Sequence, residues 1–243
     1  MLDNINEILF TITVVLAVSA VAFRLILRVN RVEWIRRLTT WLLEYVDVGL
    51  SALVIALVIR SFVIEPFKIP SSSMEDTLLI GDHLFVNRFI YGLKLPYMTS
   101  RPLALRHPRR GDIIVFVPPH QRDKDFIKRV IAVPGDTIEI RKQVVIVNGT
   151  RLVEPFVVHK DSGSHFIASP ARDNMRPVKV PPGKYFMMGD NRDRSEDSRY
   201  WGFADLADIK GRAMIIYFSA DPNAALYDVI HKIRWGRLLH LVS

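Results

Sequence analysis

The chain contains no cysteine among its 243 residues, so disulfide bonds and thiolate chemistry are both excluded. Several well-known catalytic motifs are also missing: a Gly-x-Ser-x-Gly elbow, a His-Glu-x-x-His zinc motif, a phosphate-binding P-loop, and a lysine three residues after any serine of the run at 71–73. The seven histidines are scattered without the spacing of metal ligands. We therefore expect neither a metal site nor a cofactor.

Negative charge is the scarcer sign in this sequence. The 33 Lys and Arg residues exceed the 25 Asp and Glu residues, which gives a formal net charge of +8. A mean hydropathy of +0.17 indicates a folded protein with an apolar excess. A basic chain of this kind suits either a nucleic acid or an anionic membrane as partner, and the distribution of the charge decides between them.

Apolar residues are concentrated near the N-terminus, in two segments. Residues 8–27 contain a single charge, Arg24, and are about 20 residues long, which suffices for a membrane-spanning helix. A cleaved signal peptide would need a basic N-terminal region, whereas this terminus is acidic. Residues 48–64 form a second, shorter candidate with Arg60 near its end, where a long side chain reaches the interface.

The segment between these candidates, residues 28–47, is rich in arginine. Short Arg-rich loops stay on the cytoplasmic side of a membrane. We therefore expect residues 1–27 to hold a first transmembrane segment, residues 48–64 a second, and residues 65–243 to form an extracytoplasmic domain. This topology explains part of the net charge and weakens the nucleic-acid hypothesis.

From residue 65 onward the pattern changes to short apolar runs separated by turn residues, which is typical of a mainly β domain arranged as a sandwich or barrel. Asn148-Gly149 indicates a two-residue hairpin turn. The more polar stretch 141–181 is expected to be a smaller inserted lobe, and residues 203–208 a short helix. The predicted strands are 112–117, 126–133, 137–140, 144–147, 184–188 and 212–218.

Three consecutive serines, Ser71 to Ser73, follow the second apolar segment by a few residues. A serine run is most often a turn, so a catalytic reading requires a base. Lys128 lies in the apolar strand 126–133, where alternation places it on the same face as Phe126. Desolvation lowers the pKa of a lysine from about 10.4, and a neutral amine can accept the proton of a serine hydroxyl. The alternative is a lysine that snorkels from a sheet edge.

A loop dense in short polar side chains spans residues 188–203. Charged loops usually mark a solvated surface, but this one closes on Tyr200-Trp201-Gly202, which indicates an ordered loop packed on the domain. Asp197 and Arg199 are spaced to pair within it, and Ser195 is a candidate to orient a neutral lysine by a hydrogen bond. The acidic spacing does not fit a calcium loop.

These motifs, taken in order, resemble those of the bacterial type I signal peptidases, or leader peptidases, over nearly the full length of the chain. After the paired apolar segments come Arg60-Ser-Phe…Glu65-Pro-Phe, Ile69-Pro-Ser-Ser-Ser-Met74…Gly81-Asp82, Arg110-Gly-Asp-Ile-Ile-Val-Phe116, Ile127-Lys-Arg…Pro134-Gly-Asp136, and the loop from Gly189 to Gly202. Each is weak alone, but five in sequence are highly specific. The family's β core with a smaller β lobe agrees with the predicted strands.

The resemblance implies roles for individual residues. Ser73 is implied to be the nucleophile, Lys128 the general base, Ser71 with the backbone of Ser73 the oxyanion hole, and Ser195 a hydrogen-bond partner of the lysine. Supporting roles fall to Asp197, Arg199 and Arg129. The residues implied to line the substrate pockets are Phe67, Ile69, Pro70, Met74, Leu78, Phe126 and Ile127, of which Ile127 is the least expected because alternation places it opposite Lys128.

This chain departs from the family at two positions, one within the serine run and one shortly after it. Ser72 stands where relatives often have glycine, and Asp76 where they often have proline. Neither position supplies a catalytic group, so the departures concern the rigidity of the loop. Some relatives carry a disulfide in the outer lobe, which this chain cannot form.

The resemblance further implies a multi-pass protein of the bacterial inner membrane that removes signal peptides from exported preproteins through an acyl-enzyme. A substrate added as a strand would point its −1 and −3 side chains the same way, into shallow pockets that accept small residues. The implied partners are preproteins and the lipid bilayer, with the protein translocation machinery as a further candidate, and no nucleic acid is expected.

Other classes of function stay open at this point. One is a membrane-anchored basic binding module without catalysis, in which the serines form only a turn. Another is a self-cleaving regulator with the same Ser–Lys chemistry, although that class is soluble and the two apolar segments argue against it. An inactive homologue is the third. The basic and apolar tail 220–243 fits either an interfacial element or an ordinary surface strand or helix.

Overall fold

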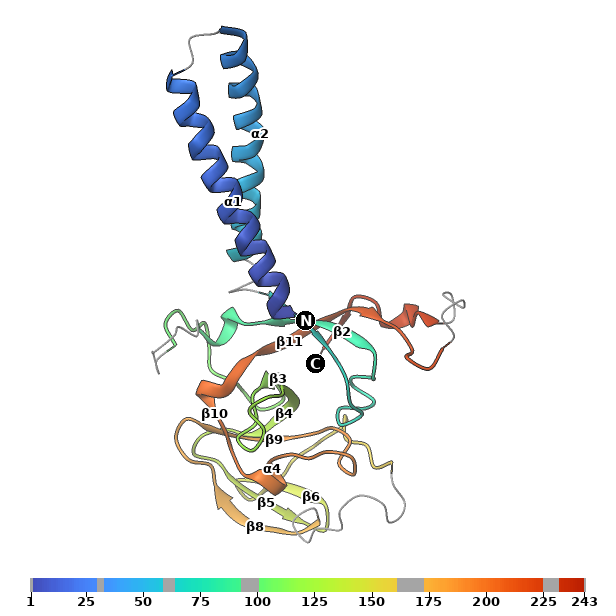
Figure 1. The fold of residues 1–243 in the computed structure, drawn as a ribbon. Coiled ribbons are helices and arrows are strands. Elements are labelled where there is room, and N and C mark those ends of the chain that lie inside the picture. Colours follow the sequence, from blue (N-terminus) through green and yellow to red (C-terminus); the bar gives the residue numbers. More distant parts are fainter. Residues whose placement is uncertain are drawn as a thin grey trace. The chain divides into compact units, whose positions relative to one another are not determined.

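The computed structural model describes residues 2–29, 33–58, 64–92, 101–160, 173–224 and 232–242. Arg60 and residues 161–172 of the expected smaller lobe therefore lie outside the described residues. The chain divides into two compact units, Met1–Val63 and Ile64–Ser243, each of which is described by itself (Figure 1).

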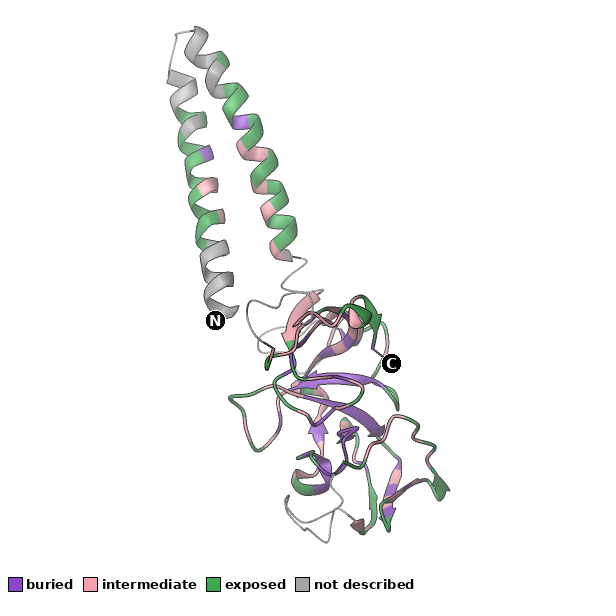
Figure 2. Cartoon of the chain, turned by 90° about the vertical axis from the view of Figure 1, so that its right-hand side faces the viewer, coloured by how far each residue is buried: buried purple, intermediate pink, exposed green. Residues whose placement is uncertain are grey.

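The first unit is a pair of α-helices, α1 (Leu2–Val29) and α2 (Glu33–Val58). Many of the described residues of both helices are exposed, as Figure 2 shows, and many of these exposed residues are apolar. Arg24 of α1 donates to Asp47 of α2 over 2.6 Å, so these two charges neutralise each other within the pair.

Of the two expected membrane segments, one has a counterpart among the described residues. Among the described residues one segment, Thr40–Leu57 in α2, is long and apolar enough to cross a membrane, whereas the apolar stretch of α1, Thr11–Ala22, is shorter than a spanning helix requires. The expectation of two spans is therefore not confirmed. The expected second span, 48–64, overlaps this segment at residues 48–57, and residues 59–63 of it lie outside the described residues.

The second unit is mainly β, as predicted, and its larger sheet has the order β1-β2-β11-β3-β4-β9-β10, with β12 paired to β11 (Figure 1). The pairings between these strands are antiparallel. The strands are β1 (Ile64–Lys68), β2 (Asp82–Asn87), β3 (Ile113–Phe116), β4 (Phe126–Ala132), β9 (Lys184–Met188), β10 (Ala204–Asp205), β11 (Ile209–Ser219) and β12 (His240–Leu241).

A second sheet forms the smaller lobe, with the order β7-β6-β5-β8. Asn148 and Gly149 both have positive φ and join β6 to β7, which confirms the predicted hairpin turn. The lobe starts earlier than the expected residue 141, because β5 pairs with β6 and β8 and not with the larger sheet. Its strands are β5 (Thr137–Arg141), β6 (Val144–Val147), β7 (Thr150–Arg151) and β8 (Met175–Lys179).

Short helical turns complete the second unit. The helix expected at 203–208 is wrong in part: β10 occupies its start, and only Leu206–Asp208 (η3) is a 3-10 turn, because Ala204 pairs with Tyr185 of β9. The other described turns are η2 (Phe89–Tyr91), α4 (Ser198–Trp201) and η4 (Trp235–Arg237).

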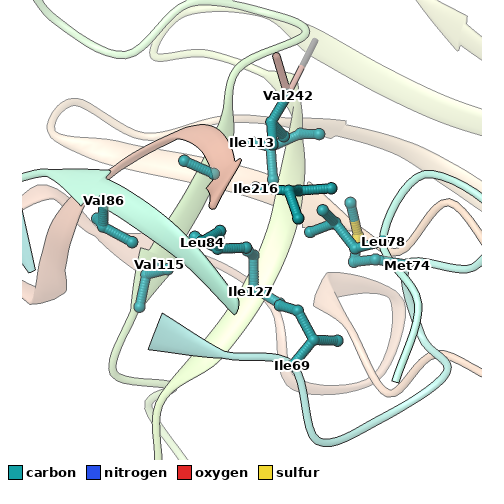
Figure 3. Packing of buried hydrophobic residues seen from close by; sticks show 11 residues of the cluster. Ile69, Met74, Leu78, Leu84, Val86, Ile113, Val115, Ile127, Ile216 and Val242 are labelled. Atoms are coloured by element: carbon teal, nitrogen blue, oxygen red, sulfur yellow. The ribbon is translucent and has the colours of Figure 1, made fainter. Parts of the chain in front are cut away.

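A hydrophobic cluster beside the larger sheet holds the loop that follows β1. Ile69, Met74 and Leu78 from this loop are fully buried and point toward Ile127 of β4 and Ile216 of β11, as Figure 3 shows. Burying an aliphatic side chain of this size stabilises a fold by about 1.5–3 kcal/mol. Because Met74 directly follows Ser73, this packing also fixes the position of the third serine.

Candidate active site

The three serines lie in a loop that connects β1 to β2, which we call the serine loop (residues 69–82). The loop is closed at its base, where the Ile69 amide donates to the Asp82 carbonyl over 2.9 Å and the Gly81 amide donates to the Ile69 carbonyl over 3.1 Å. The Leu78 amide donates to the Met74 carbonyl over 2.7 Å, which tightens the interior of the loop. Backbone bonds at base and interior therefore shape the serine run.

Ser73 and Lys128 meet inside the protein. Lys128 Nζ lies 2.7 Å from Ser73 Oγ, and it also donates to the Ile127 carbonyl over 3.2 Å. Ser73 is 6% exposed and Lys128 4%. Because β4 lies between β3 and β9, Lys128 is not on a sheet edge, and the snorkelling alternative is wrong.

Burial sets the charge state of Lys128. Desolvation lowers the pKa of this amine from 10.5 to about 8, although the carboxylates of Asp197, Glu196 and Asp190 act in the opposite direction. The Phe126 ring centroid lies 5.2 Å from Nζ and adds to the apolar surroundings. With a pKa of about 8, roughly a tenth of the amine is neutral at pH 7, and the neutral form can accept a proton.

Asn191 holds the serine run from a distant part of the chain. Its amide donates to the Ser73 carbonyl over 3.2 Å, and its side-chain Nδ2 donates to the Ser72 carbonyl over 3.3 Å. Sequence reasoning did not assign this role to Asn191. The only signal was its place in the polar loop 188–203, and the contact joins residues 119 positions apart.

A buried ion pair lies behind the serine loop. Arg129 Nε and Nη2 donate to the Asp190 carboxylate over 2.9 and 2.7 Å, and Thr77 Oγ1 donates to the same carboxylate over 2.6 Å. Both charged side chains are almost completely buried. Arg129 is thus linked to the serine loop through Asp190, whereas Asp190 and Thr77 were not identified from the sequence.

Asp197 and Arg199 form the pair that their spacing predicted. Arg199 Nε and Nη2 donate to the Asp197 carboxylate over 2.8 and 2.9 Å, and both side chains are buried. Burial would raise the pKa of Asp197, but the charge and hydrogen bonds of Arg199, with the Gly189 amide, outweigh it and lower that pKa below its usual value. The pair anchors the polar loop next to the end of β9.

Replacing Asp197 with alanine is expected to destabilise the protein by about 3–5 kcal/mol, because Arg199 would remain buried without its counter-charge. The measurement is the free energy of unfolding from urea titration. Asp205→Ala is the matched control, since it breaks the partly exposed Lys184–Asp205 pair and should cost less than about 1 kcal/mol. Equal losses of unfolding free energy in the two variants would show that the buried pair stabilises the fold no more than the partly exposed one.

Ser195 does not make the expected hydrogen bond to Lys128. Its Oγ is buried, makes no hydrogen bond to Lys128, and helps to lower the pKa of Asp197. It packs against Gly189 instead: a Cβ built on Gly189 would lie 2.3 Å from Ser195 Oγ and 2.4 Å from the Ser73 carbonyl oxygen. Ser71 is exposed, and its Oγ lies 3.4 Å from Ser73 Oγ.

Most of the expected pocket residues gather beside the serine loop. Ile69, Met74, Leu78 and Ile127 lie in one buried cluster (Figure 3). Phe67 is partly buried and packs against this cluster. Pro70 is exposed, and Phe126 packs in a different cluster. Ile127, the least expected pocket residue, lies with the residues of the serine loop. The reason is that the loop packs on the face of β4 opposite to Phe126.

No group of three or more His, Asp or Glu side chains among the described residues could hold a metal ion. A hollow of about 300 Å³ lies in the smaller lobe, lined by residues of β6, β7 and the segment 154–159. Ser73 and Lys128 do not line it, so we assign the candidate chemistry to the buried pair and not to this hollow.

Comparison with known proteins defines the class of the chain. Residues 42–218 match the family described as signal peptidase, peptidase S26. The chain is 35% identical over 226 residues to signal peptidase I of Pseudomonas aeruginosa, covering 78% of this chain and 80% of that protein. It is 33% identical over 239 residues to signal peptidase I of Aquifex aeolicus, covering 73% of this chain and 88% of that protein.

A solved structure of a signal peptidase I from Enterococcus faecalis is also similar, with 32% identity and a TM-score of 0.37, and it covers 44% of this chain and 97% of that chain. The family match extends over more than half of the present sequence. The chain belongs to the signal peptidase family, peptidase S26. Its enzyme class is therefore that of signal peptidase I, a peptidase that acts on preproteins.

Proposed function

We propose that this protein is a membrane-bound serine endopeptidase that removes N-terminal signal peptides from exported preproteins, with Ser73 as nucleophile and Lys128 as general base. The observation that carries the proposal is the 2.7 Å contact between Lys128 Nζ and Ser73 Oγ, both buried. A nucleophile within hydrogen-bond reach of a base whose pKa is lowered by burial is the arrangement that covalent catalysis requires.

The first half of the reaction acylates the serine. Neutral Lys128 takes the hydroxyl proton of Ser73 while Oγ attacks the scissile carbonyl carbon. The tetrahedral oxyanion is stabilised by the Ser71 hydroxyl and the Ser73 backbone N–H. The intermediate then collapses: the C–N bond breaks, Lys128 gives its proton to the leaving amine, and the signal peptide stays esterified to Ser73.

The second half releases the signal peptide. Neutral Lys128 takes a proton from a water molecule, which attacks the ester carbon, and the same proton returns to Ser73 Oγ as the C–O bond breaks. Arg129, Asp197 and Arg199 act by holding the surroundings of the pair. Ser195 packs beside Gly189 and completes the wall of the site without a bond to the lysine.

The pocket residues support a preference for small side chains. Ile69, Met74, Leu78 and Ile127 are buried in one closely packed cluster, so a large side chain would have to displace them. A substrate strand laid beside the serine loop points alternate side chains the same way. Small residues at −1 and −3 are therefore the proposed specificity.

A membrane location is part of the proposal. It is supported by Thr40–Leu57, the described segment that is long and apolar enough to span a bilayer, and by the exposed apolar side chains of both helices. We propose a multi-pass protein of the bacterial inner membrane, with the β unit on the extracytoplasmic side. The lipid bilayer and preproteins are its partners, and the translocation machinery is a further candidate.

Incubation of the full chain with a purified preprotein, in lipid or detergent, tests this function. We expect a single cut after a small residue, mapped by mass spectrometry of both products, and no product with the Ser73→Ala variant. Cleavage by Ser73→Ala at the wild-type rate would show that Ser73 is not the nucleophile. A cut elsewhere than after small residues at −1 and −3 would contradict the proposed specificity.

The activity should rise with pH through about 8, because the base is the neutral form of Lys128, whose pKa is about 8. Glu196→Gln removes a carboxylate that raises this pKa, so the rising limb should move to lower pH. The measurement is kcat/KM from pH 6 to 10 with a fluorogenic peptide. Glu139→Gln, in the smaller sheet, is the control and should leave the limb in place; an upward shift in Glu196→Gln would refute the assignment.

A further inference from the structure

The C-terminal segment 232–242, which we call the C-terminal strap, lies across the second unit. It is fastened to β11 by backbone bonds: the Arg234 amide donates to the Ser219 carbonyl over 3.0 Å, the Leu239 amide to the Ile216 carbonyl over 2.8 Å, and β12 pairs with β11. The strap is therefore an ordered part of this unit.

One side chain of the strap reaches into the serine loop. Arg237 Nη2 donates to the Asp82 carboxylate over 2.6 Å and to the Thr77 carbonyl over 2.9 Å, and its Nε donates to Asp82 over 3.2 Å. Arg234 also donates to the Ile80 carbonyl over 2.9 Å. The strap thus contacts three positions in the second half of the loop.

Asp82 is the residue on which these bonds converge. Its carboxylate is completely buried and also accepts the Leu79 amide over 2.8 Å and the Ser219 hydroxyl over 2.6 Å. Its carbonyl accepts the Ile69 amide, which closes the base of the serine loop. A buried carboxylate requires a counter-charge. Arg237 supplies it, so the closed loop depends on the strap.

Thr77 transmits the same constraint toward the serines. Its side chain donates to Asp190, while its carbonyl accepts Arg237, so the residue is held from both sides. Thr77 lies four positions after Ser73, in the turn where the Leu78 amide donates to the Met74 carbonyl. Displacing the Thr77 carbonyl would therefore loosen the turn that presents Ser73 to Lys128.

We propose that Arg237 is a positioning residue for Ser73, which acts through Asp82 and Thr77 and touches neither the substrate nor the reacting atoms. The inference rests on the proposed peptidase function. It makes the C-terminal strap a required part of the catalytic apparatus and not a passive surface element.

The test uses the full chain and three variants of the pair. Arg237→Gln removes the counter-charge, and Arg237→Lys keeps a charge but loses the two-pronged contact. Asp82→Asn combined with Arg237→Gln removes both charges, so no lone carboxylate stays buried. Arg110→Gln is the matched control, because Arg110 makes the same two-pronged contact with Asp136 at a turn outside the serine loop.

Arg237→Gln is expected to lower kcat for preprotein cleavage by about 100-fold while KM changes less than about twofold, since a displacement near 1 Å has an effect of this size on a catalytic pair. Arg237→Lys should recover part of the loss, and Arg110→Gln should retain the wild-type kcat. Hydrogen exchange of peptides covering residues 69–82 should speed up in Arg237→Gln and not in the control.

Two results would overturn the inference. One is a folded Arg237→Gln protein, or the folded double variant if the single one does not fold, with the wild-type kcat. The other is a fall in activity that only matches the fraction of unfolded protein. If the wild-type chain leaves the preprotein uncut, the proposed function fails, and the exchange measurement alone decides the inference: unchanged exchange in residues 69–82 would refute it.

Discussion

Lys128→Met is expected to lower kcat/KM for preprotein cleavage by about 10⁴-fold or more, as Ser73→Ala does, because each variant removes one half of a unit that reacts together. Methionine has a similar length and no charge, so it should fill the buried space of Lys128 without a desolvation cost. The fold should therefore survive, and the melting temperature should not fall.

The double variant Ser73→Ala/Lys128→Met sharpens this expectation. If the two side chains act as one unit, the double variant should be little worse than either single variant. If the two side chains contributed independently, the double variant would lose kcat/KM by the product of the two single effects. Lys210→Met, which breaks the partly exposed pair with Asp125, is the control and should cleave at close to the wild-type rate. Substantial cleavage by purified Lys128→Met would remove the lysine from the mechanism.

Gly189→Ala should have the second largest effect, at least about 100-fold on kcat/KM, although it adds a single methyl group. That Cβ would lie 2.3 Å from Ser195 Oγ, 2.4 Å from the Ser73 carbonyl oxygen and 2.5 Å from Ser195 Cβ. The backbone at Ser73 would have to move, and overpacking of this kind also destabilises a protein by about 1–3 kcal/mol. Peptide kinetics and thermal unfolding measure the two effects.

Two further variants separate the contacts of Gly189. Gly49→Ala in α2 is the matched control, since a Cβ there meets nothing within 4 Å, and it should be close to neutral. Gly189→Ala combined with Ser195→Gly relieves both contacts with Ser195 and leaves the one with Ser73. Its activity should stay low; recovery to the wild-type level would show that the serine loop tolerates the methyl group and that our reading of this contact is wrong.

The sequence predicted those parts of the fold that depend on local pattern. Lys128 is on an apolar strand because its neighbours alternate, and Asn148-Gly149 makes a hairpin because both residues tolerate positive φ. Asp197 and Arg199 pair because they stand two positions apart at the start of α4, where Asp197 is the N-cap. In each case the partner is close in sequence, so spacing alone carries the information.

The rest depends on partners that are far apart in the chain. Strand β1 contains Pro66 and was not predicted, since proline is compatible with a strand only at an edge, and β1 lies at the edge of its sheet. The bonds from Asn191 to the serine run, and from Arg237 to Asp82, join segments that no local pattern connects.

The long separation between Ser72 and Asn191 has a consequence for the newly made chain. Their 119 positions take on the order of 6–24 s to synthesise at typical ribosomal rates, and Arg237 follows later still. During that time the Ser72 and Ser73 carbonyls lack their hydrogen-bond donor, Asn191, and the Asp82 carboxylate lacks its counter-charge, Arg237. A growing chain therefore carries the Ser73 hydroxyl outside its final surroundings until Asn191 and Arg237 have been synthesised and have packed against the serine loop.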